Sequence, residues 1–297
     1  MRLAILGGDQ RQIFMARKLA EDGHKVFIWG LGECGSEIVT GIVCARWEEA
    51  IREAEAVILP LPASADGVRV YCPLQREDVF LRVPALLDAL GDRVLLGGRF
   101  TESLRGIAEQ KGVHWIDYYE SEVLQLKNAL PTAEGAIAIA MRELPVTIDG
   151  IHAVILGYGR IGSVLGQKLH GLGAHVTVYA RRSEQLALAT LNHHTARKMS
   201  CSGDHTGLSD LPQDCRVIFN TVPHWLLTRN LLSKLPKSCV LIDLASAPGG
   251  IDHNTAAELG LRSVWGTSLP GKCTPESAGY ILAEVLEEIL SDMDIQL

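Results

Sequence analysis

A glycine-rich turn near the middle of the chain is the clearest sign of chemistry in this sequence. The segment Gly157-Tyr-Gly-Arg-Ile-Gly162 follows a short apolar run and opens an amphipathic stretch, the setting that a dinucleotide-binding fingerprint requires. Gly157 permits the tight turn, Gly159 lets a diphosphate approach the backbone, and Gly162 allows a helix to pack closely on the strand. Unpaired N–H groups at the start of that helix favour the diphosphate charge. The sequence therefore predicts a dinucleotide site, with an ordinary tight turn as the alternative.

The residues after the next predicted strand, His175–Tyr179, indicate which dinucleotide binds. NAD sites usually carry Asp or Glu at this point to bond the ribose 2′-hydroxyl. Ala180 stands here instead, so there is no carboxylate. Arg181, Arg182 and Ser183 follow, and two guanidinium groups with a hydroxyl suit a 2′-phosphate. NADP(H) is therefore the expected cofactor, and a solvated basic turn is the alternative.

Three loops of the second half are expected at the carboxyl ends of strands, where open α/β sheets bind ligands. They are Asn220–Trp225, Asp243–Gly250 and Gly266–Cys273. His224 is a candidate general acid or base because imidazole titrates near neutrality, and the alternative is a structural loop histidine. Lys272 is the second catalytic candidate, expected to hold a substrate carboxylate. The predicted cofactor-binding residues are Gly157, Tyr158, Gly159, Arg160, Ile161, Gly162, Ala180, Arg181, Arg182, Ser183, Thr221, Val222, Pro223, Leu244 and Ala245.

The chain begins with a degenerate form of the same glycine motif, Gly7-Gly-Asp-Gln-Arg11. Asp9 replaces the close-approach glycine, and its carboxylate would repel a diphosphate. This half is therefore interpreted as a substrate or partner domain. Arg11 is a candidate to bind a substrate carboxylate, and a helix-face arginine is the equally weighted alternative.

Two other kinds of site are not expected. His193, His194, Cys201 and His205 lie in a stretch that resembles an exposed loop, and their spacing matches no metal-ligand pattern. No Gly-x-Ser-x-Gly elbow supports a hydrolase triad. The sequence thus predicts neither a metal centre nor a serine hydrolase.

Strands alternating with helices predict the elements that position these residues. In the first half the apolar runs are Leu3–Leu6, His24–Trp29, Ala56–Pro60, Val94–Gly97 and Val113–Asp117; in the second they are Ala153–Leu156, His175–Tyr179, Val217–Asn220, Val240–Asp243 and Ser263–Trp265. Such a pattern is typical of βαβ units. The expected fold class is α/β, with two Rossmann-like, doubly wound parallel-sheet domains linked by interdomain helices.

Four segments are expected along the chain: a substrate or partner domain at 1–130, an interdomain helix and hinge at 131–150, an NADP-binding domain at 151–273, and a C-terminal helix at 274–297. Thr132 is predicted to cap a helix over Ala133–Met141. The helix Thr274–Leu290 is predicted to cross back to the first domain.

Composition predicts a globular protein, and the cysteines favour a cytosolic compartment. The 297 residues suggest two domains at about 150 residues each. A net charge of −7 argues against a nucleic-acid partner, and no run approaches the roughly 20 apolar residues of a membrane span. Seven cysteines without a Cys-x-x-Cys pair favour reduced thiols. The only apolar run near the N-terminus, Leu3–Leu6, is too short for a signal peptide.

Several motifs together resemble one family. They are Gly7-Gly-Asp-Gln-Arg-Gln12, Asn128-Ala-Leu-Pro-Thr-Ala-Glu-Gly135, Gly157-Tyr-Gly-Arg-Ile-Gly162, Asn220-Thr-Val-Pro223, Asp243-Leu-Ala-Ser-Ala-Pro-Gly-Gly250 and Leu269-Pro-Gly-Lys272. In this combination the chain resembles, from end to end, the A subunits of dipicolinate synthase. The hinge and the glycine fingerprint alone also resemble S-adenosylhomocysteine hydrolases and, more loosely, 2-hydroxy-acid and alanine dehydrogenases.

The resemblance implies a sporulation enzyme in the cytoplasm of the mother cell. It would oxidise dihydrodipicolinate, or a hydroxylated tetrahydro precursor, to dipicolinate with NADP+ as the hydride acceptor. A smaller, flavoprotein-like B subunit would be its partner, and a homo-oligomer is compatible with the sequence. The residues expected to bind the dicarboxylate substrate are Gly8, Asp9, Arg11, Gln12, Arg99 and Thr132, with Lys272 as a further candidate.

Two alternatives stay open at this point. One is another NAD(P)-dependent dehydrogenase of the hydroxy-acid or alanine dehydrogenase architecture. Hydroxy-acid dehydrogenases usually keep an Arg…Glu…His set in the second domain, and this chain has no obvious equivalent of the Glu–His pair. The other is a non-catalytic NADP(H)-sensing module that reports through a partner.

Overall fold

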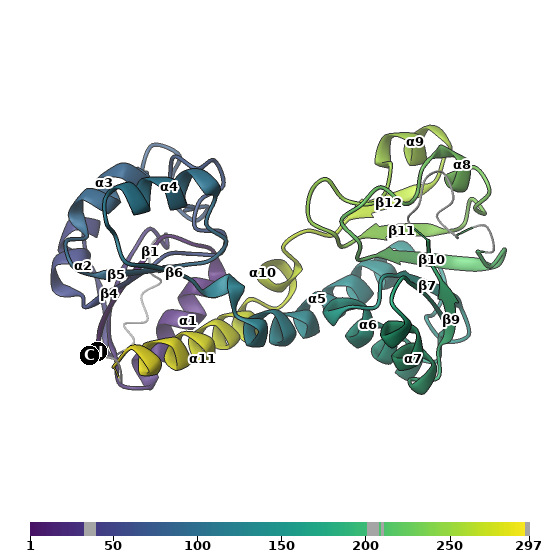
Figure 1. The fold of residues 1–297 in the computed structure, drawn as a ribbon, viewed down its shortest axis with the longest axis horizontal. Helices are drawn as coiled ribbons and strands as arrows, with labels where there is room; N and C mark the ends of the chain where they lie inside the picture. The colour runs from purple at the N-terminus through teal and green to yellow at the C-terminus, as the bar shows by residue number, and fades with distance from the viewer. Residues whose placement is uncertain (33–39, 201–207, 209–210, 295–297) are drawn as a thin grey trace. The chain divides into compact units, whose positions relative to one another are not determined.

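The chain forms two compact units in the computed structural model, which describes residues 1–32, 40–200, 208 and 211–294 (Figure 1). The first unit contains Met1–Asn128 and Thr274–Leu297, and the second contains Ala129–Cys273. Each is built on a six-stranded parallel sheet with helices on both faces. The expected fold class, two Rossmann-like domains, is confirmed.

The sheet of the first unit has the strand order β3-β2-β1-β4-β5-β6. Its strands are β1 (Arg2–Leu6), β2 (Lys25–Trp29), β3 (Ile42–Cys44), β4 (Ala56–Ile58), β5 (Val94–Gly97) and β6 (Trp115–Asp117). The chain winds outward from β1 in one direction and then from β4 in the other. The order therefore reverses between β1 and β4, and a doubly wound sheet offers its ligand crevice at such a point.

Alternate residues of these strands face two separate cores. Leu3 and Ile5 of β1 pack toward α1 and α11, while Ala4 and Leu6 pack toward α2, α3 and α4. The helices of this unit are α1 (Gln10–Glu21), α2 (Trp47–Glu53), α3 (Val83–Ala89), α4 (Glu102–Gln110), the short 3-10 helix η1 (Tyr118–Glu120) and α11 (Pro275–Asp294). Figure 1 shows α2, α3 and α4 on one face of the sheet and α1 with α11 on the other.

The C-terminal helix α11 packs along α1, so the end of the chain belongs to the first unit although it follows the second in sequence. The two helices approach closely at Gly279, where a Cβ would lie 2.5 Å from the carbonyl oxygen of Arg11. His24 Nε2 lies 2.7 Å from a carboxylate oxygen of Glu287, and Lys127 pairs with Glu284 at 2.6 Å. Close packing, together with these two side-chain contacts, holds α11 on this unit.

The second unit repeats the same topology, with the strand order β12-β11-β10-β7-β8-β9. Its strands are β7 (His152–Leu156), β8 (His175–Ala180), β9 (Thr195–Lys198), β10 (Cys215–Asn220), β11 (Val240–Asp243) and β12 (Arg262–Trp265). Its helices are α6 (Arg160–Gly171), α7 (Ser183–Leu191), α8 (Arg229–Leu232), α9 (His253–Glu258) and α10 (Leu269–Cys273). The reversal lies between β7 and β10, which pair with Leu156 opposite Asn220.

The helix α5 (Glu122–Glu143) corrects one prediction. Thr132 was expected to cap a helix starting at Ala133, but it lies inside a 22-residue helix. The helix begins just after Ser121, whose Oγ accepts a hydrogen bond from the N–H of Leu124 at 3.3 Å. Pro131 within it removes one backbone donor, yet the helix continues because its small apolar side chains are buried. Packing outweighs the local tendency of Pro131 to end a helix.

Two further expectations differ from the structure. The segment from 266 to 273 was expected to be a loop, but its second half forms the short helix α10, which carries Lys272. The neighbourhood of His194 was expected to be an exposed loop, but His194 is buried and leads directly into β9. The short edge strands β3 and β9 were also not predicted.

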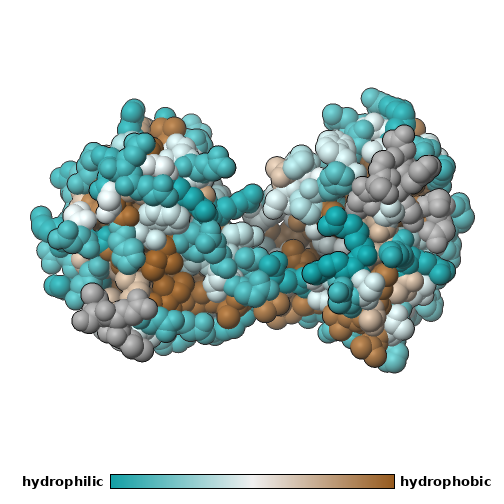
Figure 2. Space-filling view, in the orientation of Figure 1, coloured by the Kyte–Doolittle hydropathy of each residue, from teal (hydrophilic) through white to brown (hydrophobic). Residues whose placement is uncertain are grey.

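The surface is mostly hydrophilic, with apolar side chains reaching it in places (Figure 2). Met141, Val146 and Leu172 are exposed and line a cavity of about 590 Å³ in the second unit. No helix within the described ranges is both long enough and apolar enough to cross a membrane.

Candidate functional site

The glycine turn after β7 has the close contacts that its sequence predicts. Gly157 has φ +90°, and its N–H donates to the carbonyl of Tyr179 on β8 at 2.8 Å. A Cβ on Gly157 would lie 2.4 Å from Oγ1 of Thr221, and one on Gly162 would lie 2.2 Å from the carbonyl oxygen of Gly157. A side chain at Gly157 would collide with Thr221 and would be strained at this positive φ, and one at Gly162 would push α6 away from the turn.

Gly159 differs from its two neighbours in the motif. It is the N-cap of α6, with φ −89°, and a Cβ there would meet no atom within 4 Å. The fold itself thus makes no demand for glycine at this position. The open space lies beside the start of a 12-residue helix, whose unpaired N–H groups favour an anion. The turn therefore fits a dinucleotide diphosphate.

The turn forms one wall of a cavity of about 360 Å³ in the second unit. The cavity is lined by Gly157, Tyr158, Gly159, Arg181, Arg182, Gln185, Met199, Thr221, Val222 and Pro223. Eight of the fifteen residues predicted to contact the cofactor thus line one cavity. The predicted residues that do not line it are Arg160, Ile161, Gly162, Ala180, Ser183, Leu244 and Ala245.

Gln185 and Met199 are the lining residues that the sequence did not indicate. Gln185 lies in the first turn of α7, directly after the arginine pair. Met199 follows β9, and its N–H donates to the carbonyl of Ala180 at 2.8 Å. The position of Gln185 in the first turn of α7 could have suggested this residue. Met199 reaches the cavity only because the chain after β9 pairs with the end of β8, which the sequence does not reveal.

Arg181 and Arg182 directly follow β8 and are both exposed. Arg182 is the N-cap of α7, with Ser183 as the first helical residue. Neither arginine forms an ion pair with any residue that the structure describes. Their guanidinium groups are therefore available to an anionic ligand in this cavity.

Behind the turn lies a small aromatic layer. Tyr158 is buried, and its hydroxyl accepts a hydrogen bond from Nδ2 of Asn192 at 2.9 Å. Burial raises the pKa of Tyr158. The His194 ring meets the Tyr158 ring edge-on, with centroids 5.8 Å apart, and the His170 ring at the same distance. Burial, together with His170 and His193, lowers the pKa of His194, and neither of its ring nitrogens has a partner.

The lowered pKa of His194 predicts that the second unit loses stability in acid. Because its pKa is lower folded than unfolded, the unfolded chain binds more protons once the pH falls below about 6.5, the ordinary value. The stability that the buried, neutral His194 contributes is complete above that pH and is lost as the pH falls toward its folded pKa. Urea unfolding between pH 7.5 and pH 5.5 should show this loss, and His194→Met should flatten it. His224→Met, at an exposed histidine, should leave the slope as it is; equal slopes in all three proteins would contradict the assignment.

The two catalytic candidates are both exposed. His224 follows β10, and its own N–H donates to the carbonyl of Val222 at 2.9 Å. Its ring makes no hydrogen bond within the described parts of the chain. Lys272 lies on α10 rather than in a loop and forms no ion pair with a described residue. Both side chains are thus free to meet a ligand, and no contact links them to each other.

A buried carboxylate joins the loops that follow β10 and β11. The Asp243 side chain ends β11 and is wholly buried. Its Oδ1 accepts hydrogen bonds from Nδ2 of Asn220 at 2.8 Å and from the N–H of Ala245 at 3.1 Å. Its Oδ2 accepts from the N–H groups of Gly250 at 2.8 Å and Ile251 at 3.1 Å. One side chain therefore holds both loops.

The same network reaches the cavity wall through Asn220. Its side-chain amide donates to the carbonyl of Val222 at 2.9 Å and accepts from the Val222 N–H at 3.1 Å. Val222 lines the cavity. On the other side, Trp265 Nε1 donates to the carbonyl of Ala245 at 2.9 Å. Asp243 is thus one step removed from the cavity and acts on it through Asn220.

Two of the four residues considered as metal ligands, His193 and His194, lie within the described parts of the chain. Among the residues described, no three His, Cys, Asp or Glu side chains lie close enough to hold a metal ion. Cys201 and His205 lie outside the described residues, as does Cys34. The cysteines that are described, Cys44, Cys72, Cys215, Cys239 and Cys273, are all free thiols.

The N-terminal turn of the first unit is occupied by its own side chains. Asp9 caps α1 and Gln12 completes a capping box with it. The Arg11 guanidinium is nearly buried, pairs with the Asp9 carboxylate at 2.8 Å, and donates to the carbonyl of Leu61 at 2.5 Å. Gly8 has φ +118°, and its N–H donates to the carbonyl of Tyr71. Arg11 therefore serves this turn, which leaves its guanidinium little capacity for a substrate.

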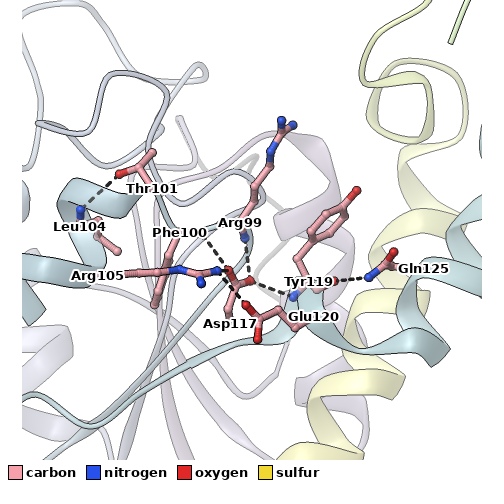
Figure 3. A network of polar contacts seen from close by, with 9 residues as sticks. All are labelled: Arg99, Phe100, Thr101, Leu104, Arg105, Asp117, Tyr119, Glu120 and Gln125. Atoms are coloured by element: carbon pink, nitrogen blue, oxygen red, sulfur yellow. Dashed lines mark hydrogen bonds and ion pairs between the residues drawn. The ribbon is translucent and has the colours of Figure 1, made fainter. Parts of the chain in front are cut away.

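The remaining substrate candidates lie elsewhere. Thr132 is inside α5 and belongs to the second unit. Arg99 lies in the turn after β5, beside a network centred on the Asp117 carboxylate (Figure 3). Of the first-unit candidates, Arg99 alone presents an exposed guanidinium.

Comparison with known proteins agrees with the division of the chain into two units. Residues 2–119 match the N-terminal domain of the dipicolinate synthase A subunit, and residues 126–253 match the NAD-binding domain of D-isomer specific 2-hydroxyacid dehydrogenases. The second unit is thus a nicotinamide-dinucleotide domain of an oxidoreductase, which agrees with the glycine turn.

Relatives cover the whole chain. The A subunit of dipicolinate synthase from Bacillus subtilis (strain 168) is 30% identical over 297 residues, covering 100% of this chain and 98% of that protein. The crystal structure of the dipicolinate synthase A chain from Bacillus subtilis has a TM-score of 0.86 at 30% identity, covering 99% of this chain and 97% of that one. The corresponding structure from Bacillus halodurans has a TM-score of 0.86 at 29% identity, covering 97% of each chain. With both halves and the full length accounted for, the chain belongs to the family of dipicolinate synthase A subunits.

Proposed function

We propose that the protein oxidises dihydrodipicolinate, or its hydroxylated tetrahydro precursor, to pyridine-2,6-dicarboxylate, with NADP(H) as its cofactor. The observation that carries the cofactor choice is the pair Arg181 and Arg182, which line the same cavity as the glycine turn. Ala180 stands where an NAD site usually carries a carboxylate. Family membership supports the choice of substrate.

The chain's own residues hold the cofactor and the reacting groups. The turn at Gly159 receives the diphosphate, and the arginine pair binds the 2′-phosphate. NADP+, when bound, supplies the hydride acceptor. Oxidation of a dihydro substrate removes one hydride and one proton, and aromatisation of the ring supplies driving force. The hydroxylated tetrahydro precursor would first lose water to reach the dihydro level. His224 is the candidate to take the proton and Lys272 the candidate to hold a substrate carboxylate.

The enzyme is proposed to act with a second polypeptide. The Bacillus subtilis relative is named as one subunit of a synthase, which supports a partner, and we propose a smaller, flavoprotein-like B subunit. We place the complex in the mother-cell cytoplasm of a sporulating bacterium. The proposal is also compatible with a homo-oligomer of this chain.

Turnover tests the proposal directly. The purified chain is mixed with NADP+ and freshly prepared dihydrodipicolinate precursor, with and without the B subunit, and ultraviolet absorbance is followed. Parallel appearance of NADPH and the aromatic dicarboxylate is expected. Tight NADPH binding without turnover would favour an NADP(H)-sensing module, and oxidation of a 2-hydroxy acid instead would favour a hydroxy-acid dehydrogenase. Absence of NADPH binding would refute the proposal.

The arginine pair predicts the cofactor preference. In the double variant Arg181→Ala/Arg182→Ala, affinity for NADPH should fall about 10- to 100-fold, because charge-assisted hydrogen bonds to the 2′-phosphate are lost at a partly exposed site. NADH lacks that phosphate, so its affinity should change much less. Fluorescence titration with both nucleotides measures the two constants. Arg229→Ala is the control, since Arg229 is exposed in the same unit but pairs with Glu258 and lies outside the cavity lining. Equal losses for NADPH and NADH would contradict the assignment.

A further inference from the structure

The turn after β5 in the first unit has an unusual backbone. Arg99 has φ +56°, and His193 and Ser268 are the only other non-glycine residues in the described ranges with a positive φ. An L-residue in this conformation costs roughly 1 kcal/mol. Glycine would adopt it freely, and Gly97 and Gly98 stand next to it in the chain. Such strain persists only where the surroundings hold it, and it is concentrated at functional sites.

Neighbouring loops hold this turn firmly. The N–H of Gly98 donates to the carbonyl of Pro60 at 3.1 Å, and its carbonyl accepts from the N–H of Ala63 at 2.7 Å. A Cβ on Gly98 would lie 2.7 Å from the Tyr118 ring and 2.8 Å from Leu61. The turn is thus packed against the segment that follows β4, at the carboxyl edge of the sheet, where doubly wound folds bind ligands.

Asp117 fixes the strained residue itself. Its side chain is 1% exposed, and its two oxygens accept from the N–H of Arg99 at 2.8 Å and the N–H of Phe100 at 2.9 Å. It also accepts from the N–H of Tyr119 at 3.0 Å and from Nη2 of Arg105 at 2.9 Å. Asp117 therefore ties the end of β6 to the turn after β5.

Three arginines near this edge differ in whether their guanidinium groups form ion pairs. Arg11 is paired with Asp9 and Arg105 is shared between Asp117 and Glu120. Arg99 forms no ion pair with a described residue, and Figure 3 shows its guanidinium directed away from the network. Because the Arg99 guanidinium takes no part in these ion pairs, its charge is available to an external anion.

We propose that Arg99 binds a carboxylate group of the substrate and that Asp117 is the positioning residue that fixes the Arg99 backbone. This rests on the proposed function, in which the substrate is a ring with two carboxylates. A guanidinium presents two parallel N–H groups to a carboxylate, and a rigid backbone reduces the ordering needed on binding. The fold thus uses a backbone conformation natural to glycine to present an arginine.

Arg99→Gly separates this role from a structural one. Glycine takes a positive φ without strain, so the variant should keep or raise the midpoint of thermal unfolding while it loses the guanidinium. Calorimetric titration of the full chain with pyridine-2,6-dicarboxylate, alone and with the B subunit, should show about 10- to 100-fold weaker binding, the loss typical of a charged hydrogen-bonded pair. Arg99→Lys should retain part of the affinity, since lysine keeps the charge without the paired donors.

Asp117→Asn tests the positioning role. It should weaken dicarboxylate binding in the wild-type background but cause no further loss in Arg99→Gly, because Asp117 acts through Arg99. A purely structural role would give the same loss in both backgrounds. Arg52→Ala is the control, since Arg52 lies in the last turn of α2, which leads into the opposite end of β4. It should bind the dicarboxylate as the wild type does.

Failure of the Arg99 role can be distinguished from failure of the proposed function. If Arg99→Gly binds pyridine-2,6-dicarboxylate and turns over its precursor with an unchanged KM, the role of Arg99 is refuted while the proposed function stands. If the wild type neither binds the dicarboxylate nor forms it, both are refuted. NADPH affinity, measured in parallel, should be the same in every Arg99 and Asp117 variant.

Discussion

Replacement of Gly159 by alanine is expected to weaken coenzyme binding about 100-fold while the protein folds as before, because hydrogen bonds to a charged group contribute about 1.5–3 kcal/mol each. The backbone at Gly159 has φ −89°, which alanine adopts readily, and its Cβ would enter open space. The new methyl group would occupy the place where the diphosphate must approach the start of α6. Calorimetric or fluorescence titration with NADPH measures the loss.

Stability and a matched control complete this test. Alanine is a poorer N-cap than glycine, so the free energy of unfolding should fall by no more than about 1 kcal/mol. Gly171→Ala is the control, since Gly171 ends the same helix and a Cβ there also meets no atom within 4 Å. It should bind NADPH as the wild type does. Unchanged affinity in Gly159→Ala would mean that the turn does not bind a dinucleotide.

The second large effect is expected at Asp243. Asp243→Asn keeps the size of the side chain but replaces one acceptor oxygen with an N–H₂ group. The N–H groups of Gly250 and Ile251 would then face a donor in place of Oδ2, and this region is buried. Unsatisfied buried donors cost about 1–3 kcal/mol each, so a loss of about 2–4 kcal/mol in unfolding free energy is expected. Chemical denaturation of the full chain measures it.

Asp243→Asn should also weaken NADPH binding, because Asn220 and the Val222 wall depend on the same network. Hydrogen exchange at residues 245–251 should become faster than in the wild type. The control is Asp214→Asn in the same unit, whose side chain is 70% exposed and pairs with His152. Its unfolding free energy should stay close to that of the wild type, because an exposed ion pair contributes little. Equal stability of Asp243→Asn and the wild type would show that the loops are held by other contacts.

The elements nearest the site follow from local sequence. The strands β7, β8, β10 and β11 are mostly apolar and buried, with Thr177 in β8 and Arg216 in β10 as polar interruptions, as expected for a sheet covered on both faces. The edge strand β9 is mostly exposed and has no such run, so the sequence does not reveal it. Pro131 and Thr132 suggest a helix boundary that packing overrides.

By itself, the sequence determined the two-domain α/β fold, the glycine turn, the basic residues after β8 and the family resemblance, because each depends on neighbours in the chain or on a run of motifs. Tertiary structure alone decided which side chains are already engaged. Arg11 is paired and Arg99 is not, although both follow glycines in similar segments. Asp243 and Asp117 collect their donors from separate loops. Contacts between residues distant in the chain leave no local pattern, so only the folded arrangement reveals them.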